Sequence, residues 1–123
     1  MQPYATGDIV LADIPDPDGK LCDHIHPAMV LKANATDSWL IGISTKFSPS
    51  SLPAFWFRLP VSSATGLTED CVLKCNWTVP FPVSRILRKI GDIPVEILEA
   101  AEAWLAQEVA LKKAANQIRQ LPS

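Results

Sequence analysis

The sequence has no apolar run that approaches the ~20 residues a helix needs to cross a lipid bilayer. Its first residues, MQPYATGD, contain neither a basic segment nor an apolar one, so we expect no secretory signal and a cytoplasmic protein. Three cysteines are an odd number without the spacing of a disulfide framework, which suits a reducing compartment. We therefore expect a protein without membrane partners and without structural disulfides.

The chain also lacks an excess of positive charge, since its formal net charge is −2 and its pI is near 5.6. This balance does not indicate a nucleic-acid-binding protein and does not exclude one, because a short single-stranded segment needs only a few well-placed cations. Six cations in the middle of the chain favour a local basic face: Lys46, Arg58, Lys74, Arg85, Arg88 and Lys89. No repeat, heptad run or low-complexity linker interrupts the sequence, so we expect one domain over residues 1–123.

Short apolar and β-branched segments dominate the first three quarters of the chain. The pattern predicts strands at residues 7–12, 28–31, 38–44, 54–59, 71–76 and 84–90. Residues 94–120 predict one long helix with Ile97, Ala101, Trp104, Leu105 and Leu111 on one face. This order predicts a mainly β protein with a helix: a small, strongly bent antiparallel sheet or barrel, with the helix covering one open side.

A long loop joins the first two strand patterns. Pro15, Pro17 and Gly19 exclude a regular element there, because each proline lacks a backbone donor and fixes its own φ. About two residues suffice to join antiparallel strands, so a loop of roughly a dozen residues predicts a binding role. We expect this loop to act as the lid of a substrate groove with His26 at its exit.

Several motifs occur in a fixed order along the chain: GDIVLADIPDPDG from Gly7, HPAMVL from His26, IGIST from Ile41, VLKCN from Val72 and RILRKIG from Arg85. Together they resemble the MazF/PemK (Kid-like) family of toxins from type II toxin–antitoxin systems. The resemblance implies an SH3-like (CcdB/MazF-type) small antiparallel β-barrel with a long C-terminal helix. It also implies a metal-independent endoribonuclease that cleaves single-stranded RNA and needs no cofactor, a homodimer, an antitoxin protein as partner, and operator DNA reached through that antitoxin.

The same resemblance implies which residues form the site. The catalytic set is His26, Ser44 and Lys74. The substrate-binding set is Lys20, His24, Thr45, Lys46, Asn76 and Trp77. Attack of the RNA 2′-hydroxyl on the adjacent phosphate needs a base, an acid and cations for the developing charge. An imidazole with an ordinary pKa of ~6.5 can serve as base or acid at neutral pH, and Lys74 can neutralise a phosphate as a point charge.

The sequence departs from the family pattern at these positions. His26 stands where the family has an arginine before proline, Lys74 and Asn76 replace an Arg-x-Asp pair, and Trp77 replaces a common glutamine. An alternative is therefore a catalytically weakened MazF-like binding protein that acts through antitoxin, nucleic-acid or protein partners. A third possibility is gyrase poisoning, as in the related CcdB toxins, but no residue of the sequence indicates this activity.

Most candidate residues also have a purely structural interpretation. A histidine before a proline is often an ordinary half-buried residue, Ser44 and Thr45 are typical turn formers, and Lys74 and Asn76 suit one solvated face. The aromatic residues are more typical of core or dimer contacts than of base stacking, although Trp77 and Phe81 flank prolines and could line a groove.

A zinc site is a further alternative. Its soft ligands would be Cys22, His24, His26, Cys71 and Cys75. Their spacing matches no common zinc motif, and cysteines in strands are mostly small buried hydrophobic residues. We therefore expect no metal in the site.

Overall fold

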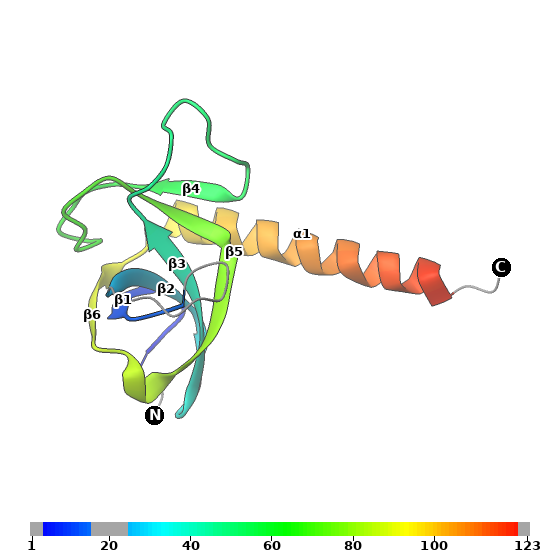
Figure 1. Ribbon diagram of the computed structural model, residues 1–123, viewed down its shortest axis with the longest axis horizontal. Helices are drawn as coiled ribbons and strands as arrows, with labels where there is room; N and C mark the ends of the chain where they lie inside the picture. The colour runs from blue at the N-terminus through cyan, green and yellow to red at the C-terminus, as the bar shows by residue number, and fades with distance from the viewer. Residues whose placement is uncertain (1–3, 16–24, 121–123) are drawn as a thin grey trace.

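The computed structural model describes residues 4–15 and 25–120, with side chains described as far as Val109. Six strands form one antiparallel sheet in the order β4-β5-β3-β2-β1-β6 (Figure 1). They are β1 (Asp8–Ala12), β2 (His26–Ala33), β3 (Asp37–Ser44), β4 (Trp56–Leu59), β5 (Cys71–Pro82) and β6 (Arg88–Asp92). A 3₁₀ turn, η1 (Val83–Arg85), precedes β6, and helix α1 (Val95–Gln120) follows it.

The sheet curls so strongly that both of its faces hold buried residues. Alternate residues of β1 enter two hydrophobic clusters, with Ile9 in one and Val10 in the other. The side chains of the neighbouring strand β2 alternate in the same way, since Met29 belongs to the cluster of Ile9 and Ala28 to the cluster of Val10. The predicted fold class, a small bent antiparallel barrel-like sheet with a C-terminal helix, is confirmed.

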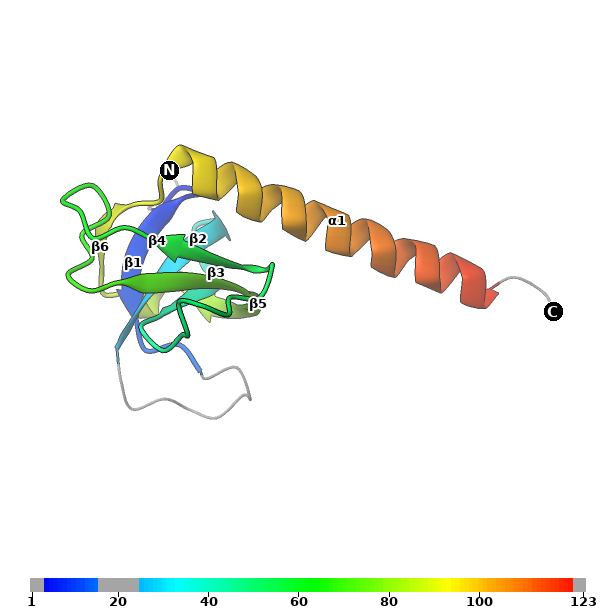
Figure 2. The same ribbon diagram turned by 90° about the horizontal axis from the view of Figure 1, so that it is seen from above.

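Helix α1 covers one open side of the sheet only with its first part. Ala101 is fully buried there, and Ile97, Leu98, Trp104 and Leu105 pack against the Ile9 cluster. Figure 2 shows the rest of the helix extending away from the sheet. Leu111, predicted on the same apolar face, lies beyond the described side chains. In the described part of the chain, no helix has both the length and the apolar character that a membrane span requires.

Two strand predictions need correction. The predicted strand at residues 84–90 begins only at Arg88, because the backbone turns at η1, where the Ile86 N–H donates to the Val83 carbonyl at 3.1 Å. The strand predicted at 71–76 continues to Pro82, through two prolines. Strand β4 pairs only with residues 71–74 of β5, so the rest of β5 is a sheet edge on the side that faces away from β3. The two prolines are tolerated there because a missing backbone N–H at a sheet edge breaks no hydrogen bond between strands.

Candidate functional site

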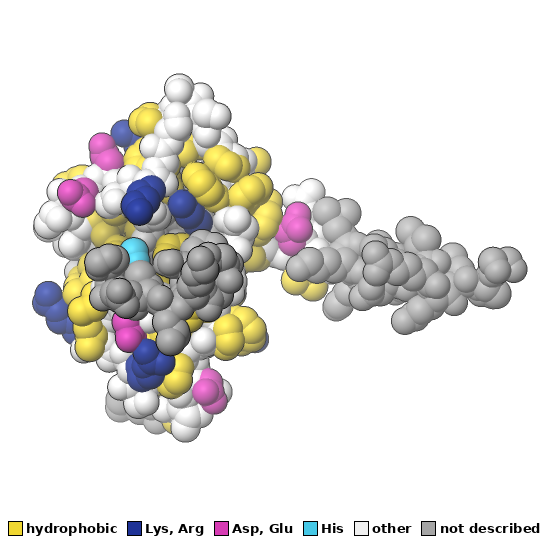
Figure 3. Space-filling view, in the orientation of Figure 1, with side chains coloured by type: hydrophobic (Ala, Val, Ile, Leu, Met, Phe, Trp, Pro, Cys, Tyr) yellow, Lys and Arg dark blue, Asp and Glu magenta, His cyan; other side chains and the backbone are white. Residues whose placement is uncertain are grey.

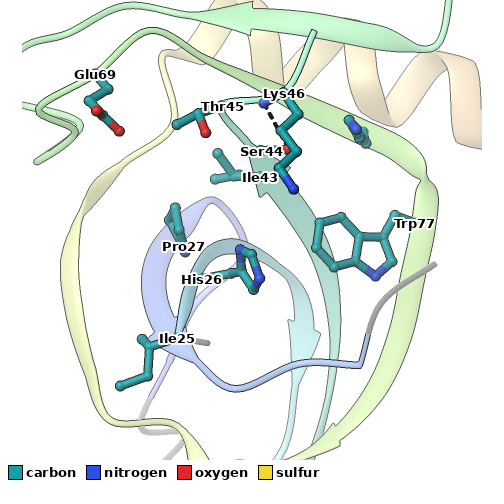
Figure 4. Close-up of a pocket in the computed structure, with 10 residues that line it drawn as sticks. Ile25, His26, Pro27, Ile43, Ser44, Thr45, Lys46, Glu69 and Trp77 are labelled. Atoms are coloured by element: carbon teal, nitrogen blue, oxygen red, sulfur yellow. Dashed lines mark hydrogen bonds between the residues drawn. The ribbon is translucent and has the colours of Figure 1, made fainter. Parts of the chain in front are cut away.

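A pocket of about 620 Å³ lies where β2 begins and β3 ends, and we call it the main pocket (Figure 4). It brings together all three residues predicted to be catalytic and three of those predicted to bind substrate: His26, Ser44, Lys74, Thr45, Lys46 and Trp77. On the face of the molecule seen in Figure 3, the histidine lies beside basic side chains. The other predicted binding residues, Lys20 and His24, lie outside the described residues, and Asn76 is not among the described lining residues.

The β2–β3 hairpin explains why residues so far apart in sequence meet here. Its turn is closed by Asn34, whose Oδ1 accepts hydrogen bonds from the N–H groups of Thr36 and Asp37 at 2.9 and 2.8 Å. At the opposite end of the hairpin, the start of β2 lies beside the end of β3, since Ala28 pairs with Gly42. His26 and Ser44 therefore belong to one rim of the sheet.

A bulge in β5 supplies the opposite wall of the main pocket. Ile41 of β3 pairs with Thr78, but Ile43 pairs with Leu73, so residues 74–77 of β5 have no register partner on β3. Side chains alternate along a regular strand, and an inserted bulge changes that alternation. Lys74 and Trp77, three positions apart, consequently line the same pocket.

Trp77 forms the inner wall and contacts His26. Only 4% of its side chain is exposed, and its indole N–H donates to the Pro15 carbonyl at 2.7 Å. The His26 ring meets the indole edge-on, with ring centroids 5.6 Å apart and an interplanar angle of 76°, which is a favourable aromatic geometry. Trp77 is too buried to be an open base-stacking platform, and its indole packs against the His26 ring instead.

The close approach of Trp77 to β3 gives a test of this packing. A methyl group at position 42 would overlap the benzo ring of Trp77. We expect Gly42→Ala to lower the free energy of unfolding by ~1–3 kcal/mol, as overpacking does elsewhere, measured by urea denaturation. In a Trp77→Leu background the same methyl group should cost little. Equal costs in both backgrounds would show that Gly42 does not pack against the indole.

Two lysines give the main pocket its positive charge. Burial lowers the pKa of Lys74, and the nearby charge of Lys46 lowers it further. Figure 4 shows the Lys46 side chain reaching into the space between His26 and Trp77. Neither lysine has a carboxylate partner within ion-pair distance among the described residues. Two cations without an ion-pair partner supply the positive charge that an anion such as phosphate would need.

Asn76 does not contact the lysines in any described interaction, but it shares a neighbour with Lys74, the Trp56 ring. Its Oδ1 accepts a hydrogen bond from the Trp56 indole N–H at 2.9 Å, and the Lys74 ammonium lies over the Trp56 ring, 4.2 Å from its centre. Lys74 and Asn76 thus both contact Trp56, which is consistent with the face they were expected to share. The hydrogen bond to Asn76 holds the aromatic ring over which the Lys74 ammonium lies.

Ser44 and Thr45 follow at the end of β3. The Ser44 hydroxyl oxygen accepts a hydrogen bond from the Lys46 backbone N–H at 3.0 Å (Figure 4). This bond shapes the turn that carries Lys46, in agreement with the turn-former interpretation of Ser44. The hydroxyl proton of Ser44 can still donate to a bound phosphate oxygen.

Four described lining residues were not predicted: Ile25, Pro27, Ile43 and Glu69. The first three are apolar neighbours of predicted residues in sequence. Glu69 is the only carboxylate among the described lining residues, and it comes from the connection before β5. Antiparallel pairing of Ser44 with Val72 brings Glu69 to the same rim of the sheet as Ser44. A prediction that β3 pairs with β5 would have identified Glu69 as a lining residue.

The cysteines of the zinc alternative have another role. Cys71 and Cys75 are 3% and 2% exposed and belong to the Ile9 cluster. Burial raises the pKa of Cys75 to about 11, which disfavours the thiolate that a metal requires. Cys22 and His24 lie outside the described residues. Among those described, no three potential ligands lie close enough to hold a metal ion.

The fold and the main pocket define a curled antiparallel β-sheet protein whose rim carries an imidazole and two cations. The family model for the PemK-like, MazF-like toxin of type II toxin–antitoxin systems matches residues 5–109, so the chain belongs to this family. The structure of the Mycobacterium tuberculosis toxin MazF-mt6 is similar, with a TM-score of 0.58 and 22% sequence identity over 78% of this chain and 89% of that one. This likeness shows a shared fold. No curated protein matches the chain in sequence.

Proposed function

We propose that this toxin is an endoribonuclease that cleaves single-stranded RNA by attack of a 2′-hydroxyl on the adjacent phosphate. The observation that carries the proposal is the combination, in one pocket, of His26 with two lysines that have no carboxylate partner among the described residues. An anionic substrate with a weakly acidic hydroxyl suits this combination of a base and cations.

The reaction can be assigned to these groups step by step. His26 takes the proton of the 2′-hydroxyl as its oxygen bonds to phosphorus, and Lys46 neutralises the charge that develops on the phosphate oxygens. Lys74 gives a proton to the 5′-oxygen as the phosphorus–oxygen bond to it breaks, a role that its lowered pKa favours. The products are a 2′,3′-cyclic phosphate and a free 5′-hydroxyl. The residues themselves supply base, acid and cations, so the proposed reaction is metal-independent.

Incubation of the purified protein with a long single-stranded RNA in EDTA tests this function. We expect discrete fragments that carry 2′,3′-cyclic phosphate and 5′-hydroxyl ends, identified by mass spectrometry. RNA that stays intact in the presence of well-folded protein would contradict the enzyme and favour the alternative, a MazF-like binding protein. That alternative draws on the absence of an arginine or aspartate from the described lining residues of the main pocket.

Family membership supports a proposal about the partners. We propose that the toxin acts in the cytoplasm as a homodimer, that a cognate antitoxin protein neutralises it, and that operator DNA is bound through that antitoxin. Size-exclusion chromatography with light scattering tests the dimer: a mass equal to one chain at micromolar concentration would contradict it.

A further inference from the structure

A second hollow of about 250 Å³ adjoins the main pocket, and we call it the side hollow. The two share Pro27, Thr45 and Glu69 as lining residues. In Figure 4 these three side chains lie on the side of the main pocket opposite Trp77. The side hollow therefore continues the main pocket over the rim of the sheet, toward β1 and β6.

The register of the sheet forms the floor of this continuation. Leu11 of β1 pairs with Pro27 on one side and with Arg88 of β6 on the other. Directly paired residues project from the same face of a sheet, so these three side chains form a row across β2, β1 and β6. All three line the side hollow, and the row leads from the main pocket to Arg88.

The six cations in the middle of the chain differ in whether they form ion pairs. Three of those cations have carboxylate partners: Arg58 with Asp70 at 3.3 Å, Arg85 with Asp13 at 2.8 Å, and Lys89 with Asp8 and Asp92 at 3.1 and 2.9 Å. The other three are Lys46, Lys74 and Arg88. In the part of the chain that the structure describes, none of these has an ion-pair partner, and all three line the main pocket or the side hollow.

A third hollow, beside Ile25, is a weaker candidate for the continuation. Its cation, Arg85, is bound to Asp13 and also lies over the Phe81 ring, 5.1 Å from its centre. Of the two hollows, only the side hollow is lined by a cation without an ion-pair partner among the described residues, so the positive charge of the main pocket continues toward Arg88 and not toward Arg85.

The outer wall of the side hollow is held in place by hydrogen bonds. Thr65 is fully buried, and its hydroxyl donates to the Pro60 carbonyl at 2.9 Å. The Asp92 N–H donates to the Ala64 carbonyl at 2.8 Å, which ties this wall to β6. Gly66, at φ +71°, lines the hollow in a backbone conformation that other residues rarely adopt. A wall fixed in this way needs no ordering when a ligand binds.

We propose that the RNA groove continues from the main pocket into the side hollow, where Arg88 binds the phosphate of a neighbouring nucleotide and Glu69 reads its base. The inference rests on the proposed function, because the main pocket supplies the cleavage chemistry. A carboxylate repels phosphate but accepts hydrogen bonds from the exocyclic amino group of a base such as cytosine. Glu69, at the junction of the two hollows, is thus a specificity residue, and Arg88 a positioning cation for the strand.

Binding of a non-cleavable RNA tests the role of Arg88 independently of cleavage. The probe is a fluorescent 2′-O-methyl RNA oligonucleotide of mixed sequence, titrated at several salt concentrations. Arg88→Ala should raise Kd about tenfold at low salt and reduce the slope of log Kd against log salt by about 0.7, the value for one phosphate contact on a single strand. Arg58→Ala is the matched control and should leave both quantities unchanged, since Arg58 is paired with Asp70 outside the two hollows.

Glu69→Ala should relax the preference for one base while leaving the salt slope intact. The measurement compares oligonucleotides that differ at one position at a time, and the wild-type protein should prefer an amino-bearing base at one position that the variant no longer distinguishes. RNA binding by Arg88→Ala equal to that of the Arg58→Ala control, or a larger loss in Arg85→Ala, would overturn the inference. RNA binding that depends on Arg88, without cleavage, would support the groove and contradict the proposed enzyme. Cleavage with RNA binding that does not depend on Arg88 would support the enzyme and contradict the groove.

Discussion

Replacing His26 by alanine should lower kcat for RNA cleavage by about two to four orders of magnitude, the usual range for loss of a general acid or base. The 2′-hydroxyl would then have no positioned base, because no other imidazole lies among the described lining residues of the main pocket. The two lysines stay in place, so the Kd for RNA should change little. Single-turnover cleavage of a short RNA measures kcat, and fluorescence titration measures Kd.

The His26→Ala protein must be shown to be folded, since the imidazole contacts Trp77 at the edge of the Val10 cluster. Near-ultraviolet circular dichroism and the urea midpoint provide this control. His26→Gln is the matched variant, because it keeps a polar side chain of similar size but cannot exchange a proton near neutral pH. A kcat within threefold of wild type in either folded variant would remove His26 from the proposed mechanism.

Lys74→Ala should lower kcat by about two to three orders of magnitude, comparable to the loss of one oxyanion-stabilising donor. The variant loses both a charge that faces the phosphate and the proposed proton donor. Lys74→Arg should restore RNA binding more than it restores kcat, since arginine keeps the charge but does not release a proton. Equal recovery of both quantities would show that Lys74 acts as a charge alone.

The pH dependence gives a separate test of the lysine pair. Lysine is protonated below its pKa, so activity that requires the Lys74 ammonium is lost as pH rises through that pKa. The positive charge of Lys46 lowers the pKa of Lys74, and its removal raises it. The alkaline limb of the kcat/KM profile should therefore lie at higher pH in Lys46→Ala, although the maximum rate is lower. A limb that stays in place, or moves to lower pH, would assign it to another group.

The positions of the strands along the chain were predicted well from the sequence, because the local residue pattern determines where a strand forms. Residues 7–12 and 38–44 have the apolar and β-branched composition of buried strands, and both form strands in the structure. The failure at 84–90 also has a local cause. Composition favours a strand there, but the chain leaves β5 at Pro82 and turns at η1 before it can pair with β1.

Only those features of the site that depend on strand ends and family motifs could be predicted from the sequence. His26 and Ser44 meet because a hairpin aligns the start of one strand with the end of the next. The approach of Trp77 to Lys74 depends on the bulge at residues 74–77, which strict alternation does not predict. The hydrogen bond from Trp56 to Asn76 joins residues 20 positions apart, and no sequence pattern indicates it. The catalytic roles of the gathered residues stay predictions until the variants are measured.

The cations of the two hollows belong to a chain with a formal net charge of −2. At physiological salt the Debye length is about 8 Å, so a few cations confined to one rim attract an approaching strand only at short range. Long-range steering is then absent, and association should fall within the unsteered range of about 10⁵–10⁶ M⁻¹s⁻¹. In the proposed reaction, an RNA strand would therefore be attracted only once it lies near the rim of the sheet that carries the two hollows.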